Sequence, residues 1–183
     1  MYYAQENPHL TVDKQLNQPG VMVWASISCK GVIGPVFFED ESVNMHSYLN
    51  MLEDIVVPKL REEYSGEDFY FQQDGAPPHY AVIVRDFLSN VFPGKWIGRR
   101  GPIEWPPRSP DLTPMDFFFW GVVKDKVFEK RPKNVEEMKE FIRRACEEID
   151  EDKELCAKVC LSVETRLQEC IDNEGFQFEH LRS

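Results

Sequence analysis

The chain has 183 residues, with 32 acidic against 21 basic side chains and a formal net charge of -11. At this length a folded chain buries roughly 70% of the surface that its unfolded form exposes. The 42% of apolar residues therefore suffice for a core, which excludes disorder throughout the chain. The acidic excess argues against nucleic-acid binding through bulk positive charge, because such binding depends on Lys and Arg that neutralise phosphates. Any role on DNA must come from local features.

The sequence carries no recognisable membrane or secretion signal. Its longest apolar run, Phe117–Val123, is far below the roughly 20 residues that cross a bilayer. The first residues lack the basic start and the apolar stretch of a secretory signal. We therefore expect an intracellular protein with no membrane partner. The five cysteines contain no C-x-x-C pair and are expected as thiols packed in or beside the core.

The first part of the chain predicts an arm followed by a hairpin. Residues 1–20 are polar, contain two prolines, and are expected to form an N-terminal arm. Val21–Ile27 and Gly31–Phe38 are rich in β-branched and aromatic residues, which is typical of strands. Because only Ser28, Cys29 and Lys30 separate the two runs, they predict adjacent strands.

A helix and a third strand are expected next. Apolar residues recur at helical spacing from Met45 to Tyr64, with Ser42 or Asn44 as candidate N-cap and Pro58 as a kink. The aromatic run Asp68–Asp74 then suits a central strand that follows a crossover helix.

The remaining elements follow in a regular order. Periodicity and breaker residues predict helices over Tyr80–Phe92, Pro114–Phe128, Val135–Ile149 and Leu155–Ile171, and a short strand over Lys95–Gly98. This order indicates an α/β protein with an N-terminal arm (1–20), a core (21–131) and C-terminal helices packed on that core (132–183).

Asp74 is the first candidate site residue, because it ends the third predicted strand. In α/β sheets, ligands gather outside the carboxyl ends of the strands. The alternative is that Asp74 and Gly75 form only a turn dipeptide. A helix follows this turn, so there is no second strand for a hairpin, and both interpretations stay open.

Asp116 is the second candidate, in the first turn of the helix that starts at Pro114. A carboxylate fixed there is able to bind a cation. The alternative is structural: with Thr113 as N-cap and Pro114 at the first helical position, Asp116 would complete a capping box.

Basic and aromatic residues concentrate in two places near these acids. They predict contacts to a DNA backbone with base stacking, or else a mixed solvated surface. The residues are Lys95, Trp96, Arg99, Arg100 and Arg108 in the first cluster, and Lys124 and Lys126 in the second.

Two long strings, FYFQQDGAPPH (69–79) and WPPRSPDLTPMDFFFWG (105–121), closely resemble the catalytic domain of mariner-type transposases. The segments VWASIS (23–28) and GVIGPVFF (31–38) look like the early strands of the same family. The resemblance implies a ribonuclease H-like mixed sheet flanked by helices. It also implies DNA cleavage and joining with three acidic residues and two Mg²⁺ or Mn²⁺ ions. Asp74 matches the family's second acid and Asp116 its third.

The resemblance also marks a departure. In the family the first acid lies on a strand before the region that begins at Tyr2, so we expect a transposase fragment that lacks its first strand and is inactive alone. The implied partners are transposon-end DNA and a second copy of the chain, in the nucleus, with no small-molecule cofactor. The alternative is a domesticated, non-enzymatic module that binds DNA or protein.

Overall fold

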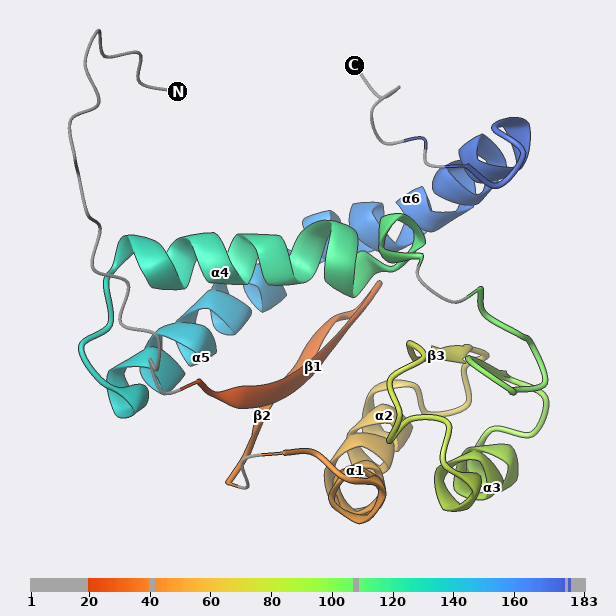
Figure 1. The fold of residues 1–183 in the computed structure, drawn as a ribbon, viewed down its shortest axis with the longest axis horizontal. Coiled ribbons are helices and arrows are strands. Elements are labelled where there is room, and N and C mark those ends of the chain that lie inside the picture. The colour runs from red at the N-terminus through yellow and green to blue at the C-terminus, as the bar shows by residue number, and fades with distance from the viewer. Residues whose placement is uncertain (1–19, 40–41, 107–108, 177, 179–183) are drawn as a thin grey trace, which may run out of the picture.

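The computed structural model describes residues 20–39, 42–106, 109–176 and 178. The predicted arm and Arg108 lie outside these residues, apart from Gly20. Figure 1 shows a central β-hairpin with helices α4 and α5 on one side and helices α1 to α3 on the other. None of the described helices combines the length and the apolar character needed to span a membrane.

The hairpin consists of β1 (Met22–Ser28) and β2 (Gly31–Phe38), which pair antiparallel as the sequence predicted. Side chains alternate between its two faces because successive residues of a strand point to opposite sides. Trp24 and Ile33 pack with one core cluster, whereas Ala25 and Val32 pack with the other. The hairpin therefore contributes side chains to both core clusters.

The helix expected after the hairpin is present and has three parts: α1 (Met45–Met51), the π-helical turn η1 (Leu52–Val56) and α2 (Val57–Glu63). Asn44 is the N-cap, and its side-chain oxygen accepts from the backbone N–H groups of His46 (2.9 Å) and Ser47 (3.1 Å). Pro58 cannot donate a backbone hydrogen bond. The expected irregularity is the π turn just before Pro58.

A β-α-β unit follows, made of β3 (Phe71–Gln72), α3 (Val82–Val91) and β4 (Trp96–Ile97). The two strands pair in parallel, with backbone bonds from Phe71 N to Lys95 O and from Gln73 N to Ile97 O, both 3.0 Å. β3 is much shorter than the predicted strand. In the described residues it is paired on one edge only, with β4.

The C-terminal part contains two short turns and three long helices. These are the 3₁₀ turn η2 (Pro110–Leu112), the π-helical turn η3 (Met115–Phe119), α4 (Trp120–Glu129), α5 (Val135–Glu151) and α6 (Lys153–Asp172). The side chain of Asn134 caps α5 and that of Asp152 caps α6. α5 packs on α4 and β2, and α6 packs on α5 and both strands of the hairpin.

Candidate active site

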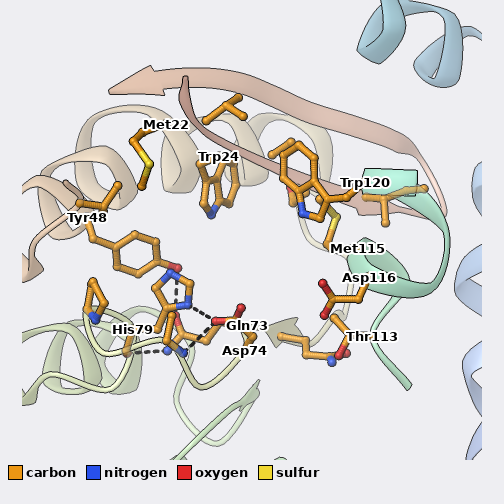
Figure 2. A pocket seen from close by; sticks show the side chains of 18 of the residues that line it. Met22, Trp24, Tyr48, Gln73, Asp74, His79, Thr113, Met115, Asp116 and Trp120 are labelled. Atoms are coloured by element: carbon orange, nitrogen blue, oxygen red, sulfur yellow. Dashed lines mark hydrogen bonds and ion pairs between the residues drawn. The ribbon is translucent and has the colours of Figure 1, made fainter. Parts of the chain in front are cut away.

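A cavity of about 500 Å³ lies between β1, the end of β3 and the start of η3. Figure 2 shows that aromatic and aliphatic side chains cover one side of it, while Asp74 and Asp116 lie at the other. The labelled lining residues are Met22, Trp24, Tyr48, Gln73, Asp74, His79, Thr113, Met115, Asp116 and Trp120. The structure therefore brings the two predicted acids to one cavity.

Asp74 lies two residues after the end of β3, next to Gln73, whose backbone N–H bonds to Ile97 O of β4 and so fixes the start of the loop. Its Oδ1 accepts a hydrogen bond from the backbone N–H of Ala76 (3.0 Å) and lies 2.5 Å from Nδ1 of His79. Contact with His79, the largest effect, lowers the pKa of Asp74 below its ordinary value, although partial burial opposes this. Asp74 thus stabilises a local turn, as the alternative interpretation expected, while its ionised carboxylate still lines the cavity.

His79 and two neighbours hold the loop that carries Asp74. The His79 ring stacks on Tyr48 with centroids 4.2 Å apart. The Tyr48 hydroxyl donates to Gln73 Oε1 (3.0 Å), and Gln73 Nε2 donates to the backbone oxygen of His79 (2.7 Å). Tyr48 and Gln73 are both buried. This network ties α1, the end of β3 and the loop together.

Sequence reasoning missed this network. His79 belongs to one of the strings that carried the resemblance, but the sequence assigns it no role of its own. Tyr48 lies within the helix predicted from Met45 to Tyr64, and the pattern does not distinguish it from the other apolar positions. The available signal was the proximity of Gln73 and His79 to Asp74 in that string.

Asp116 lies in the π turn η3, which places its carboxylate beside the cavity (Figure 2). The predicted capping box is wrong, because no side chain caps the start of η3. The hydroxyl of Thr113 donates to Ser109 O (3.1 Å), and the Asp116 N–H bonds to the backbone oxygen of Thr113 (2.8 Å). The Asp116 carboxylate therefore does not serve as a cap.

The electrostatic environment of Asp116 differs from that of Asp74. Partial burial, followed by the negative charge of Asp74, raises the pKa of Asp116, and Lys124 opposes the change. Placing two carboxylates at one cavity thus makes the ionised form of Asp116 less favourable. A bound cation would reverse this effect, because it favours both ionised carboxylates.

The donor set suits a hard divalent cation. Within the described ranges, no group of three or more His, Cys, Asp or Glu side chains is arranged to hold a metal ion. Mg²⁺, however, is commonly bound through one or two carboxylates while it keeps several waters. Asp74 and Asp116 fit that pattern with oxygen ligands alone.

Trp96 corrects one predicted DNA contact. Only 1% of this residue is exposed, and its indole N–H donates to Ser89 Oγ (3.2 Å). The prediction that Trp96 stacks on DNA is wrong, because the aromatic β-pattern around it reflects burial in the core. Lys95 is partly exposed and forms an ion pair with Asp68.

Arg99 and Arg100 lie near the acidic side of the cavity. The Arg99 guanidinium sits 4.3 Å from the Tyr80 ring centroid, and that of Arg100 lies 5.6 Å from it. A side chain built at Gly75 would meet Arg99 Cδ at 3.6 Å, so Arg99 passes close to the residue after Asp74. Both arginines are exposed and available to an anion.

The second basic cluster is divided. Lys124 is exposed and close enough to Asp116 to affect its carboxylate. Lys126 instead forms a 2.5 Å ion pair with Glu148 of α5. Lys124 therefore lies beside the site, whereas the charge of Lys126 is paired with that of Glu148.

Two known transposases are similar to this chain in sequence. The Tc3 transposase of Caenorhabditis elegans is 31% identical over 157 residues, covering 85% of this chain and 44% of that protein. The Tc1 transposase of the same organism is 27% identical over 158 residues, covering 85% of this chain and 53% of that protein. The chain is related to mariner-like transposases. No family model matches it.

Solved structures support the same fold. The Mos1 transposase catalytic domain with raltegravir and Mn matches with a TM-score of 0.74 and 24% identity, covering 87% of this chain and 78% of that one. A pre-cleavage Mos1 transpososome matches with a TM-score of 0.72 and 22% identity, covering 98% of this chain and 52% of that one. The expected ribonuclease H-like α/β fold is confirmed, and this mariner-like chain spans about half the length of the curated relatives it matches.

Proposed function

We propose that this chain contributes the catalytic core of a metal-dependent DNA strand-cleaving and strand-joining reaction. The observation that carries this proposal is the meeting of Asp74 and Asp116 at one cavity, although they come from separate parts of the fold. The relationship to Tc3 and Tc1 transposases supports the same reaction.

The two acids have a simple task in this proposal. Their carboxylate oxygens hold divalent cations, and the contact with His79 keeps Asp74 ionised. When bound, Mg²⁺ or Mn²⁺ supplies activation of a nucleophilic oxygen and charge stabilisation at phosphorus. The Tyr48–Gln73–His79 network holds the Asp74 loop in place. A carboxylate that is held in position binds a metal ion more tightly than a mobile one.

Exposed arginines supply the contacts to the substrate. We assign backbone phosphate binding to Arg99 and Arg100, which lie beside the loop after Asp74, with Lys124 on the Asp116 side. Charge-assisted hydrogen bonds from guanidinium groups are well suited to phosphate oxygens. Because the whole chain carries a net charge of -11, these local contacts determine where DNA binds.

A third carboxylate is part of the proposal. Residues 22–27 of β1 and 71–74 around β3 line opposite parts of the cavity, and in the described residues each of these strands is paired on one edge only. We propose that an additional strand that carries an acid pairs beside them. Without it, we expect the two acids to bind Mg²⁺ weakly and the chain alone not to cleave DNA.

The biological setting rests on the relatives. Structures that resemble this chain include a Mos1 paired-end complex with the left transposon end. By analogy we propose transposon-end DNA as the substrate, a second copy of the chain as a partner, and the nucleus as the location. Mos1 catalytic domain structures were solved with Mn and with Mg, which supports the choice of cations.

Two assays on the same preparations test the proposal. Fluorescence anisotropy of a labelled DNA duplex should rise in Mn²⁺ but not in EDTA, and Asp74→Asn and Asp116→Asn should each lose the metal-dependent part. Asp86→Asn is the control, since it removes an exposed acid of α3 outside the cavity. Equal DNA binding by all variants, with and without metal, would contradict the proposed site.

Nicking of supercoiled plasmid DNA tests the inactivity of the chain alone. We expect no nicked product in Mg²⁺ or Mn²⁺. Metal-dependent nicking that Asp74→Ala abolishes would contradict the inactivity while supporting the reaction. Nicking that survives Asp74→Ala would contradict the assigned acid.

A further inference from the structure

Two arginines near the Asp74 loop share one aromatic ring. The guanidinium carbons of Arg99 and Arg100 lie 4.3 Å and 5.6 Å from the centroid of the Tyr80 ring, and both arginines are exposed. Among residues 20–39, 42–106, 109–176 and 178, no carboxylate lies within ion-pair distance of either guanidinium. Two neighbouring positive charges therefore have no carboxylate partner in this part of the chain.

The two arginines extend from a closed loop that follows β4. The backbone N–H of Gly98 donates to Ile103 O (3.1 Å), and that of Gly101 donates to Gly98 O (3.0 Å). Glu104 Oε2 accepts a hydrogen bond from the backbone N–H of Arg100 (3.1 Å). These bonds fix the backbone that carries both guanidinium groups.

Two glycines seat this loop against buried residues behind the site. A Cβ at Gly101 would come within 2.7 Å of the Trp96 ring, and a Cβ at Gly98 would come within 3.1 Å of Gln73 Cγ. A side chain at Gly101 would overlap the ring, and one at Gly98 would crowd Gln73. Trp96 and Gln73 are both buried, so the loop has a rigid support.

Arg100 adopts a backbone conformation that is costly for a residue with a Cβ. Its φ is 60°, in the left-handed region that glycine occupies without a steric penalty. Glycine would suit this turn better, yet an arginine occupies it. Strain of this kind clusters at functional sites, which indicates that the exposed guanidinium has a task.

Tyr80 belongs to the segment that carries Asp74 and His79. Its backbone oxygen accepts from Arg85 Nε of α3 (3.1 Å), and the residue is half-buried. An aromatic face attracts a guanidinium and leaves the N–H groups at the edge of that guanidinium free to donate. Tyr80 therefore gathers two cations while their hydrogen-bond donors stay available.

We propose that Arg99, Arg100 and Tyr80 form a subsite for the terminal phosphate of a cut DNA strand, with Tyr80 as the positioning residue. A terminal phosphate carries a charge of about −1.5 to −2 at pH 7 and three acceptor oxygens. A phosphate within a strand carries one negative charge. Two guanidiniums that lack a carboxylate partner match the terminal phosphate better, because each is able to form charge-assisted hydrogen bonds with it.

The subsite rests on the proposed function, since cleavage at phosphorus leaves a phosphate on one of the two new ends. Arg99 Cδ would lie 3.6 Å from a Cβ at Gly75, so a phosphate bound here stays next to Asp74. A cut end that is held in this place remains beside the acids until the strands are joined.

Binding of short DNA duplexes without metal tests the subsite. Three fluorescent duplexes of one sequence carry a 5′-phosphate, a 3′-phosphate or only hydroxyl ends, and anisotropy is measured in EDTA at low salt, where charge contacts are least screened. We expect at least one phosphorylated duplex to bind about tenfold more tightly than the hydroxyl duplex, and the better one identifies the strand end. Equal affinities for all three, or no measurable binding of any, would overturn the subsite.

Matched variants assign the preference to the named residues. Arg99→Ala and Arg100→Ala should each lose it, whereas Arg61→Ala, at an exposed position of α2, should keep it. Tyr80→Phe should keep the preference because the ring remains. Tyr80→Leu should lose it with the affinity for the hydroxyl duplex unchanged, and a purely structural role would instead weaken the binding of every duplex.

Arg100→Gly separates the task of the side chain from the stability of the turn. This variant should raise the melting temperature by about 2 °C, because glycine adopts the positive φ freely, and should nevertheless lose the preference for the phosphorylated end. A folded Arg100→Gly chain that keeps the preference would overturn the proposal, even if the Tyr80→Leu chain fails to fold.

Failure of the subsite and failure of the proposed function give different results. Asp74→Asn should keep the end preference in EDTA, because no metal takes part in it. A chain that binds Mn²⁺ at Asp74 and Asp116 but does not distinguish the duplex ends would overturn the subsite alone. An end preference without any metal binding would support the subsite and contradict the proposed cation site.

Discussion

Replacing Tyr48 with phenylalanine removes one buried hydroxyl from the network that holds the Asp74 loop. Only 1% of Tyr48 is exposed, and its hydroxyl donates to Gln73 Oε1, which lies in a residue that is only 6% exposed. The substitution keeps the ring and its stacking on His79. The variant loses the hydrogen bond, and the buried Oε1 of Gln73 loses its donor.

The magnitude follows from the burial of both groups. A buried polar atom left without its partner costs about 1–3 kcal/mol, so we expect the free energy of unfolding to fall by about 2 kcal/mol. For a chain of this size that corresponds to a melting temperature about 4–8 °C lower. Thermal unfolding followed by circular dichroism at pH 7 measures the change.

Tyr70→Phe is the matched control. Tyr70 precedes β3 and is 56% exposed, so the loss of its hydroxyl should change stability by no more than about 0.5 kcal/mol. If Tyr48→Phe is as stable as the wild type, or if the two variants are equally destabilised, the assigned role of the network is wrong.

High pH provides a second measurement on the same variants. Burial, and then the negative charge of Asp74, raise the pKa of Tyr48 above its ordinary value, while contact with Trp24 opposes this. The folded chain keeps this proton when the unfolded chain has begun to lose it, from about pH 10 upward. The stability that Tyr48 contributes is present below about pH 10 and is lost as the pH rises further. The melting-temperature difference between wild type and Tyr48→Phe should therefore narrow above pH 10; a constant or widening difference would refute this explanation.

Three further substitutions test the packing, the caps and the charge balance. Trp96→Ala should destabilise the fold by about 3–5 kcal/mol in urea unfolding, because it empties a fully buried site, whereas Trp105→Ala at a half-buried position should cost clearly less; equal effects would contradict the core assignment of Trp96. Asn44→Ala removes the cap of α1 and should cost about 1 kcal/mol, and Asn44→Asp should restore most of it; a silent alanine variant would show that the cap is unimportant. Asp116→Asn should raise the melting temperature at pH 7 by about 1 °C, a small gain because solvent reaches this carboxylate and screens its interactions. The pKa of Asp116 is raised in the folded chain, so this gain should vanish below about pH 4, where the wild-type carboxyl is protonated in both states; a gain that persists there would contradict the charge explanation.

Periodicity and turn residues were sufficient to predict most elements of the fold. The hairpin, the N-cap at Asn44 and the helices α3, α5 and α6 lie where the pattern of apolar residues indicated. The two π turns could not be predicted, because a π turn shifts the helical spacing by one residue without a distinct residue type. β3 is shorter than predicted because a strand extends only as far as its partner, and the partner β4 is distant in sequence.

The two acids of the site could be predicted from the sequence, but the residues that hold them in place could not. Asp74 and Asp116 follow a strand end and a proline-initiated turn, both of which are visible in the sequence. The burial of Trp96 and the network of Tyr48, Gln73 and His79 depend on contacts between remote segments. Residue type alone does not distinguish an aromatic ring that stacks on DNA from one that fills a core.

Titration of the chain with Mn²⁺, followed by electron paramagnetic resonance, tests most directly whether Asp74 and Asp116 form one cation site. The wild-type chain should bind Mn²⁺ at this site, and Mg²⁺ should displace it. Asp74→Asn and Asp116→Asn should each weaken the binding at least about tenfold, whereas Asp86→Asn should leave it unchanged. Equal Mn²⁺ affinity in the wild type and all three variants would contradict the site.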